Sequence, residues 1–101
     1  MRDWDYLRYS IAHLFNFNLF GMPFTGADVC GFFGAKDDDL CARWYQLAVF
    51  YPFARSNYNA TETKDYEPYN LGADQKTMVK DAMTLRMRYI RMMRTCLFEL
   101  H

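Results

Sequence analysis

The chain has 101 residues, of which 51% are hydrophobic and 19% aromatic, and its 12 basic and 12 acidic side chains give a formal net charge of zero. This length allows one small domain or a part of a larger one, and the apolar share is sufficient for a core. The balanced charge argues against electrostatic binding to nucleic acid by the chain as a whole. No apolar stretch reaches the ~20 residues that span a bilayer, and no apolar segment typical of a signal peptide follows Met1.

The chain opens with a pattern that predicts a helix from about Trp4 to Phe20. Asp3 is positioned to cap the start of this helix, and Gly21 is positioned to end it. Apolar side chains recur at steps of three and four, which builds one apolar stripe. This stripe consists of Trp4, Leu7, Ile11 and Leu14.

Residues 24–33 predict a short strand followed by a loop. The run is bounded by proline and glycine and does not alternate apolar with polar residues, which favours a strand buried on both faces of a parallel sheet. Asp28 lies in this run between Gly26 and Gly31. A carboxylate at the end of a strand and before a helix is typical of the functional loops of α/β barrels.

Three consecutive acids, Asp37 to Asp39, open a second predicted helix that extends to about Phe50. Carboxylates at this position cap free amide groups and suit the positive end of the helix dipole. Capping is preferred to metal binding because no His or second acidic cluster nearby completes a ligand set, and no metal site is expected. The apolar stripe consists of Leu40, Trp44 and Leu47, with Cys41, Tyr45 and Ala48 beside it.

A second short strand is predicted from Tyr51 to Ser56, where the sequence turns polar. Residues 57–72 then predict a surface loop that is longer than the usual length of about 4–6 residues. This loop contains Asn59-Ala60-Thr61, a glycosylation sequon that is relevant only in the secretory pathway.

The longest helical pattern spans about Asp74 to Leu100, with Asp74 as its expected cap and Cys96 as an expected core thiol. Its second half carries four arginines, for which a solvated basic face is preferred to an anion or membrane-surface contact. That preference rests on a Met-rich apolar stripe, which is typical of a core face. The stripe consists of Met78, Ala82, Leu85, Tyr89, Met92, Cys96 and Leu100.

The predicted order is helix, strand, helix, strand, loop, helix, which is an α/β pattern. Two strands do not make a stable sheet, so this unit is expected to be incomplete on its own. A longer chain or a partner chain would supply the rest of the sheet.

Two blocks of sequence and a weaker third one cover nearly the whole chain. The first runs from Phe17 through the GADVCGF motif at residues 26–32, and the second comprises residues 40–47 and 50–55. The third runs from Leu85 through Thr95 to His101. In order and spacing these blocks resemble glycoside hydrolase family 31, the retaining α-glucosidases, and most closely its lysosomal and intestinal branch.

This resemblance implies a (β/α)8 TIM barrel with its active site at the C-terminal ends of the strands. Residues 1–101 would form a C-terminal segment of that domain, with strands seven and eight ending at Asp28 and Arg55. The family hydrolyses terminal α-linked glucose, in maltooligosaccharides or other α-glucosides, with two carboxylates that are about 5–5.5 Å apart. The resemblance puts the nucleophile on an earlier strand and the acid/base just before Met1. No catalytic residue is therefore expected in this chain, and the mechanism needs no cofactor.

The resemblance also assigns four residues to the substrate pocket. Asp28 would accept hydrogen bonds from sugar hydroxyls or hold an arginine in place, and loop capping is its alternative role. Phe32 would pack on the apolar face of a sugar, or in the core. Arg55 would orient pocket carboxylates, or form a buried structural ion pair. Asn57 stands where the family has a His that contacts the sugar, and an Asn still forms a hydrogen bond with a hydroxyl.

Cys30 and Cys41 match a pair that is disulfide-bonded in the lysosomal and intestinal branch, with two small buried thiols as the alternative. Closing so short a loop would contribute about 2–3 kcal/mol in the chain-entropy model. A bridge would also imply an oxidising compartment, so that the protein would be lysosomal or extracellular and the Asn59 sequon would be accessible to glycosylation.

Two functions are compatible with these features. The leading hypothesis is a segment of a retaining α-glucosidase of the secretory pathway. The alternative is a non-catalytic structural or assembly subunit built on the same barrel segment. The changed residue Asn57 and the absence of the catalytic carboxylates favour the alternative, whereas Asp28, Phe32, Arg55 and the cysteine spacing favour the enzyme.

Overall fold

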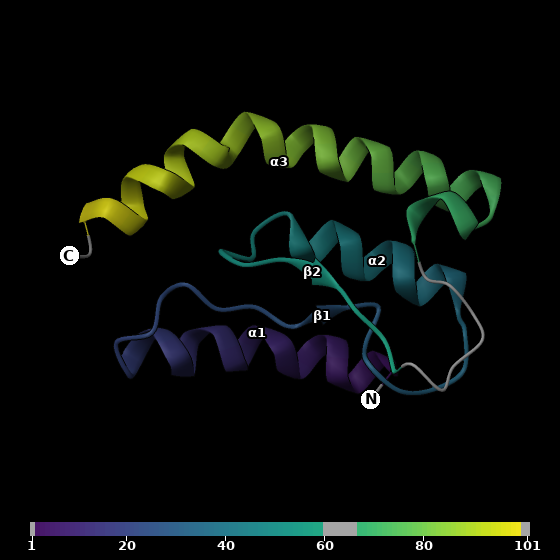
Figure 1. Cartoon of the computed structure of the whole chain (residues 1–101), viewed down its shortest axis with the longest axis horizontal. Helices are drawn as coiled ribbons and strands as arrows, with labels where there is room; N and C mark the ends of the chain where they lie inside the picture. Colours follow the sequence, from purple (N-terminus) through teal and green to yellow (C-terminus); the bar gives the residue numbers. More distant parts are fainter. Residues whose placement is uncertain (1, 60–66, 100–101) are drawn as a thin grey trace.

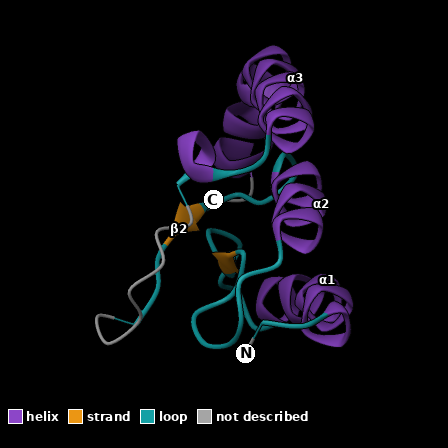
Figure 2. Cartoon of the chain, turned by 90° about the vertical axis from the view of Figure 1, so that its right-hand side faces the viewer, coloured by secondary structure: helices purple, strands orange, loops and turns teal. Residues whose placement is uncertain are grey.

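The computed structural model describes residues 2–59 and 67–99. Its helices and strands follow the predicted order. The helices form one layer with α2 in the middle, and the strands lie on one side of this layer (Figure 1 and Figure 2). The elements are the helices α1 (Trp4–Leu19), α2 (Asp38–Ala48) and α3 (Ala73–Glu99), the strands β1 (Asp28–Val29) and β2 (Arg55–Ser56), and the short 3-10 helix η1 (Pro68–Asn70).

Strands β1 and β2 pair in parallel, with Asp28 opposite Arg55 and Val29 opposite Ser56. Both are shorter than the runs that predicted them, because in the part of the chain that the structure describes each strand has one neighbour to pair with. For the same reason, the expected burial on both faces is wrong at the start of the first run. Phe24 at the start of the run is 62% exposed, whereas Val29, five residues later in β1, is buried.

The segments that lead into the two strands approach each other closely. The Phe53 amide donates to the Thr25 carbonyl at 3.1 Å, which extends the contact of the strands backward along the chain. A Cβ atom on Gly26 would overlap the carbonyl oxygen of Phe53. Glycine at this position therefore permits the backbone approach on which the strand pairing depends.

Local signals at both ends determine where α1 begins and ends. The Asp3 carboxylate accepts a hydrogen bond from the Tyr6 amide at 2.8 Å, which confirms the predicted cap. At the other end Gly21 has a φ of +83°, and the Met22 amide donates to the Phe17 carbonyl at 2.8 Å. This is the arrangement that a glycine commonly gives to the end of a helix.

Half of the predicted stripe of α1 packs against the core. Leu7 and Leu14 are partly buried against it, whereas Trp4 and Ile11 are 52% and 42% exposed. Helix α1 lies at the edge of the helical layer (Figure 2), so described elements cover only one side of it.

Helix α2 provides most of the core, as its stripe predicted. The Asp37 carboxylate accepts hydrogen bonds from the amides of Asp39 and Leu40, both at 3.0 Å, and so caps the helix start. The helix lies between α1 and α3 with the strands beside it, which leaves few of its faces in water (Figure 2). Its buried side chains are Leu40, Cys41, Ala42, Trp44, Tyr45 and Ala48.

Helix α3 departs from two predictions. It begins at Ala73, so Asp74 lies inside the first turn and is not the cap. Only Val79 and Ala82 are buried along the helix, and Cys96, expected in the core, is an exposed free thiol. The physical reason is length, because the second half of α3 extends beyond the end of α2 (Figure 1). Among the described residues, no helix is both long enough and apolar enough to span a bilayer.

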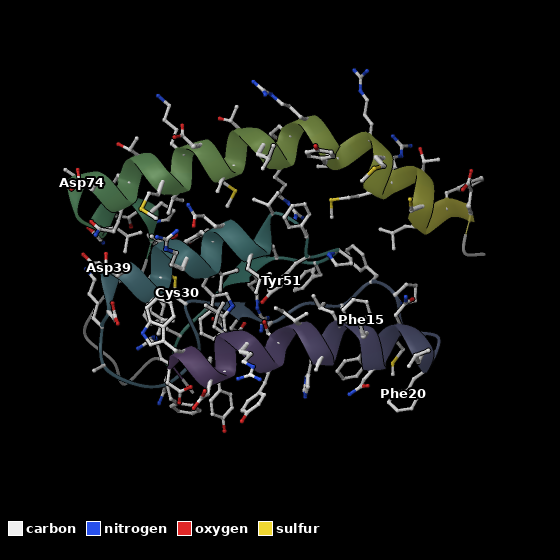
Figure 3. All side chains as sticks on the ribbon, turned by 180° about the vertical axis from the view of Figure 1, so that it is seen from behind. Phe15, Phe20, Cys30, Asp39, Tyr51 and Asp74 are labelled. Atoms are coloured by element: carbon white, nitrogen blue, oxygen red, sulfur yellow. A yellow bond between two sulfur atoms is a disulfide. The ribbon has the colours of Figure 1, made fainter. Side chains whose placement is uncertain are left out.

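An apolar groove of about 380 Å³ lies between the ends of α1 and α3 that extend past α2. Phe15 and Phe20 lie at this end of α1, away from Cys30 (Figure 3). Part of the Met-rich stripe of α3 lines this groove. Its lining includes Ile11, Phe15, Phe50, Met92, Met93 and Leu97.

Candidate functional site

The carboxyl ends of the two strands bring Asp28 and Arg55 together. The Arg55 Nη2 and Nε atoms lie 3.0 and 3.1 Å from the same carboxylate oxygen of Asp28. The contact follows from the strand register, which places the two residues opposite each other. The Asp28 side chain is 23% exposed and that of Arg55 is 55% exposed, so this ion pair is accessible and not buried.

The Asp28–Arg55 pair contributes little to stability when it is exposed to solvent. A solvent-exposed ion pair contributes about 0–1 kcal/mol to stability, because water screens the charges and two side chains lose freedom. Orientation is the larger consequence, since two guanidinium nitrogens on one oxygen fix the direction of the carboxylate.

The chain turns sharply directly after β1. The Gly31 amide donates to the Asp28 carbonyl at 2.9 Å, and Cys30 has a φ of +74°. That backbone region is usually left to Gly or Asn, and it costs another residue roughly 1–2 kcal/mol. Residues 30–34, which we call the β1 loop, therefore begin from a strained residue that its surroundings must hold.

A disulfide joins Cys30 to Cys41, with 4.4 Å between their Cα atoms. This is the pair that the family resemblance implied. Both cysteines are almost completely buried, at 0% and 1% exposure. The bond connects the strained start of the β1 loop to the first turn of α2, so the loop and the helix are fixed relative to each other.

Phe32 and Asn57 belong to the two loops that follow the strands. Phe32 is half-buried, and its ring meets that of Phe33 edge to face at a centroid distance of 4.6 Å. The Asn59 amide donates to the Phe32 carbonyl at 3.2 Å, so the loop after β2 reaches the β1 loop. The half-buried Asn57 lies between Arg55 and this contact in the chain. The Ala60 and Thr61 positions of the sequon lie outside the described residues.

Two arginines that the sequence analysis did not connect with the site also support its strands. Arg86 on α3 places Nη1 at 2.7–2.9 Å from the carbonyl oxygens of Ala48, Val49 and Tyr51. A cation here compensates the negative end of the α2 dipole and fixes the turn that leads into β2. Burial lowers the pKa of the Arg86 guanidinium. The second arginine, Arg2, contacts the β1 loop.

Buried tyrosines support the same region from within. Tyr51 lies between α1 and α2 (Figure 3), where its hydroxyl forms a hydrogen bond with the Ser10 hydroxyl. Burial raises the pKa of Tyr51 and also that of Tyr45. The Tyr51 hydroxyl is thus a neutral hydrogen-bonding group within the core.

The side chains at this end suit a polyhydroxyl ligand. Asp28 offers acceptors, Arg55 and Asn57 offer donors, and an aromatic ring packs well on the apolar face of a sugar. No group of three or more His, Cys, Asp or Glu residues within 2–59 and 67–99 is arranged to hold a metal ion. The apolar groove is a separate feature, since none of the four predicted pocket residues lines it.

Comparison with known proteins shows the family to which the chain belongs. The family model described as the glycosyl hydrolases family 31 TIM-barrel domain matches residues 1–96. Lysosomal acid alpha-glucosidase of Tetrahymena pyriformis is 45% identical over 87 residues, which are 86% of this chain and 9% of that protein. Intestinal sucrase-isomaltase of Suncus murinus is 38% identical over 99 residues, which are 98% of this chain and 5% of that protein.

The chain is also similar in sequence and in fold to solved structures. A crystal structure of the glucosidase II alpha subunit with bound Glc1Man2 is 43% identical, with a TM-score of 0.81 over 85% of this chain and 9% of that chain. The chain thus spans about a tenth or less of the length of the relatives that it matches. It belongs to glycoside hydrolase family 31, in the TIM-barrel domain of that family.

Proposed function

We propose that this chain forms part of the substrate pocket of a retaining α-glucosidase that releases terminal α-linked glucose. The accessible Asp28–Arg55 ion pair at the carboxyl ends of two parallel strands is the observation that supports this best. In α/β barrels the residues at that edge are the ones that act on ligands. The relatives named alpha-glucosidase support the same chemistry.

Each pocket residue has a role that its position permits. Asp28 accepts hydrogen bonds from sugar hydroxyls, while Arg55 keeps the carboxylate oriented. Phe32 packs against the apolar face of the sugar ring. Asn57 donates to a hydroxyl in the position of the family His, without a positive charge.

The proposal places residues 1–101 as strands seven and eight of the barrel, with the flanking helices. The remaining strands belong to a longer chain or to a partner chain. Hydrolysis with retention needs a nucleophile and an acid/base about 5–5.5 Å apart, and these two carboxylates lie on the rest of the barrel. The residues described here bind and orient the glucose unit.

The disulfide supports a place in the secretory pathway, either lysosomal or extracellular. Buried disulfides persist in oxidising compartments and are rare in the cytosol, and several of the similar proteins, including the one from Tetrahymena pyriformis, are named lysosomal. Glycosylation of Asn59 belongs to the same proposal. Mass spectrometry of the native protein tests it, because free thiols at Cys30 and Cys41 would contradict the assignment.

A second function is favoured by one observation, which is Asn57 in place of the family His. A protein that retains the barrel segment but not the activity would serve as a structural or assembly subunit. Such a protein would keep its core and disulfide, and it would have no need of an oriented Asp28 carboxylate.

Maltose binding and hydrolysis of 4-nitrophenyl α-glucoside by the purified native protein distinguish the two functions. We expect Asp28→Asn to weaken maltose binding about tenfold or more, because a hydrogen bond to a charged group is lost. Asp5→Asn, on the exposed first turn of α1, is the matched control and should change nothing. If the native protein neither binds maltose nor hydrolyses the glucoside, the structural subunit is the better explanation.

A further inference from the structure

Arg2 makes an unusual set of contacts for a residue that precedes a helix. Its side chain is only 8% exposed, and its guanidinium donates to backbone carbonyls of the β1 loop. Nε lies 2.8 Å from the Cys30 oxygen and Nη2 lies 2.9 Å from the Gly31 oxygen, while Nη1 contacts the Gly34 oxygen. One side chain therefore binds both ends of a five-residue loop.

The β1 loop needs such a partner because its backbone is irregular. The strained φ of Cys30 and the turn at Gly31 direct carbonyl groups away from any strand ladder, and a buried carbonyl without a partner destabilises the fold. A guanidinium carries five donors in a rigid planar fork, so it can bind several carbonyls at once. A lysine ammonium is a compact charge and does not match that geometry.

Cys30 is held by two different contacts. The disulfide holds its side chain against α2, and Arg2, directly before α1, holds its carbonyl. Asp28 lies two residues before this point and Phe32 two residues after it. The conformation of the β1 loop therefore determines where both of these pocket residues lie.

We propose that Arg2 is a positioning residue for the candidate sugar pocket, because its guanidinium holds the β1 loop in the conformation that presents Asp28 and Phe32 to a glucose unit. This inference rests on the proposed function for the identity of the ligand. Arg2 itself does not touch the sugar. Its effect on binding passes through the backbone of the β1 loop.

Amide hydrogen exchange and maltose titration of the native protein test this proposal together. Arg2→Met should accelerate exchange of the β1 loop amides about tenfold or more, since hydrogen bonds from a charged donor are lost, and should leave exchange in α2 unchanged. Maltose binding should weaken by a similar factor. Arg2→Lys should fall between Arg2→Met and the unchanged protein. Arg8→Met removes an exposed arginine of α1 and should alter neither measurement.

Three results would overturn the proposal. One is exchange of the β1 loop at its original rate in Arg2→Met, and another is equal acceleration in the loop and in α2, which would indicate a general loss of stability. The third is a faster loop with unchanged maltose affinity. If the unsubstituted protein does not bind maltose, the proposed function fails and with it the pocket role of Arg2. The exchange rates then still report whether Arg2 holds the loop.

Discussion

Helix α2 and residues 87–99 of α3 are both amphipathic, but they occupy very different surroundings. Trp44 on α2 is 2% exposed, whereas Met87 and Met92 on α3 are 66% and 54% exposed. Helix α2 has a helix on each side and the strands beside it, while this part of α3 extends past them (Figure 1 and Figure 2). An apolar stripe thus indicates which face of a helix is suited to a core, and the neighbouring layers decide whether that face is buried.

The largest expected difference between the two regions concerns side-chain truncation. Trp44→Ala should lower the free energy of unfolding by about 3–5 kcal/mol, because it leaves a cavity in the core. Met92→Ala should change it by at most about 0.5 kcal/mol, as exposed substitutions usually do. Urea unfolding followed by fluorescence or circular dichroism measures both. Similar losses would mean that residues 87–99 are covered in the native protein.

The cysteines allow a second comparison. Replacing Cys30 and Cys41 together by Ala should lower the free energy of unfolding by about 2–3 kcal/mol, because the unfolded chain regains the freedom of the closed loop. Cys96→Ala on α3 should have almost no effect, since its thiol is free and exposed. Denaturant unfolding without reductant provides the measurement. A larger loss for Cys96→Ala than for the pair would reverse the assignment of core and surface.

Arg86 lies between the first half of α3, which contains the buried residues Val79 and Ala82, and the mostly exposed residues 87–99. Arg86→Met should lower the free energy of unfolding by about 1–3 kcal/mol, because three carbonyl groups at and just after the end of α2 lose a charged donor. Arg91→Met, on the exposed part of the same helix, is the matched control. Thermal unfolding of the two variants gives the comparison, and an unchanged stability of Arg86→Met would show that water replaces the guanidinium without loss.

The smallest expected difference in stability is between substitutions at the start of α2 and at the start of α3. Asp37→Ala removes an acceptor for two amides of α2 and should cost about 1–2 kcal/mol. Asp74→Ala removes only a favourable charge in the first turn of α3, which is worth about 0.3–1 kcal/mol. Adding salt should reduce the second effect more than the first. Equal effects at low and high salt would contradict this distinction.

Features that depend on neighbouring residues in the chain were predictable from the sequence. Asp3, Asp37 and Gly21 act through amides and carbonyls a few residues away, so the ends of α1 and the start of α2 matched expectation. The extent of the strands was not predictable in this way. A strand is as long as its neighbours allow, and that information is not local.

The residues of the candidate site also differ in how far they could be predicted from the sequence. Asp28 and Arg55 were expected at the ends of two strands only through the family resemblance, and the parallel register places them opposite each other. Arg2 and Arg86 were not connected with the site, since each contacts backbone carbonyls about 30 or more residues away. Carbonyls are present at every residue, so such contacts leave no pattern in the sequence.

The close approach at Gly26 restricts how this sequence can vary over evolutionary time. Any side chain at position 26 would meet the Phe53 carbonyl and push apart the two segments that carry Asp28 and Arg55. A saturation library should therefore retain glycine at 26 even where selection acts only on sugar binding.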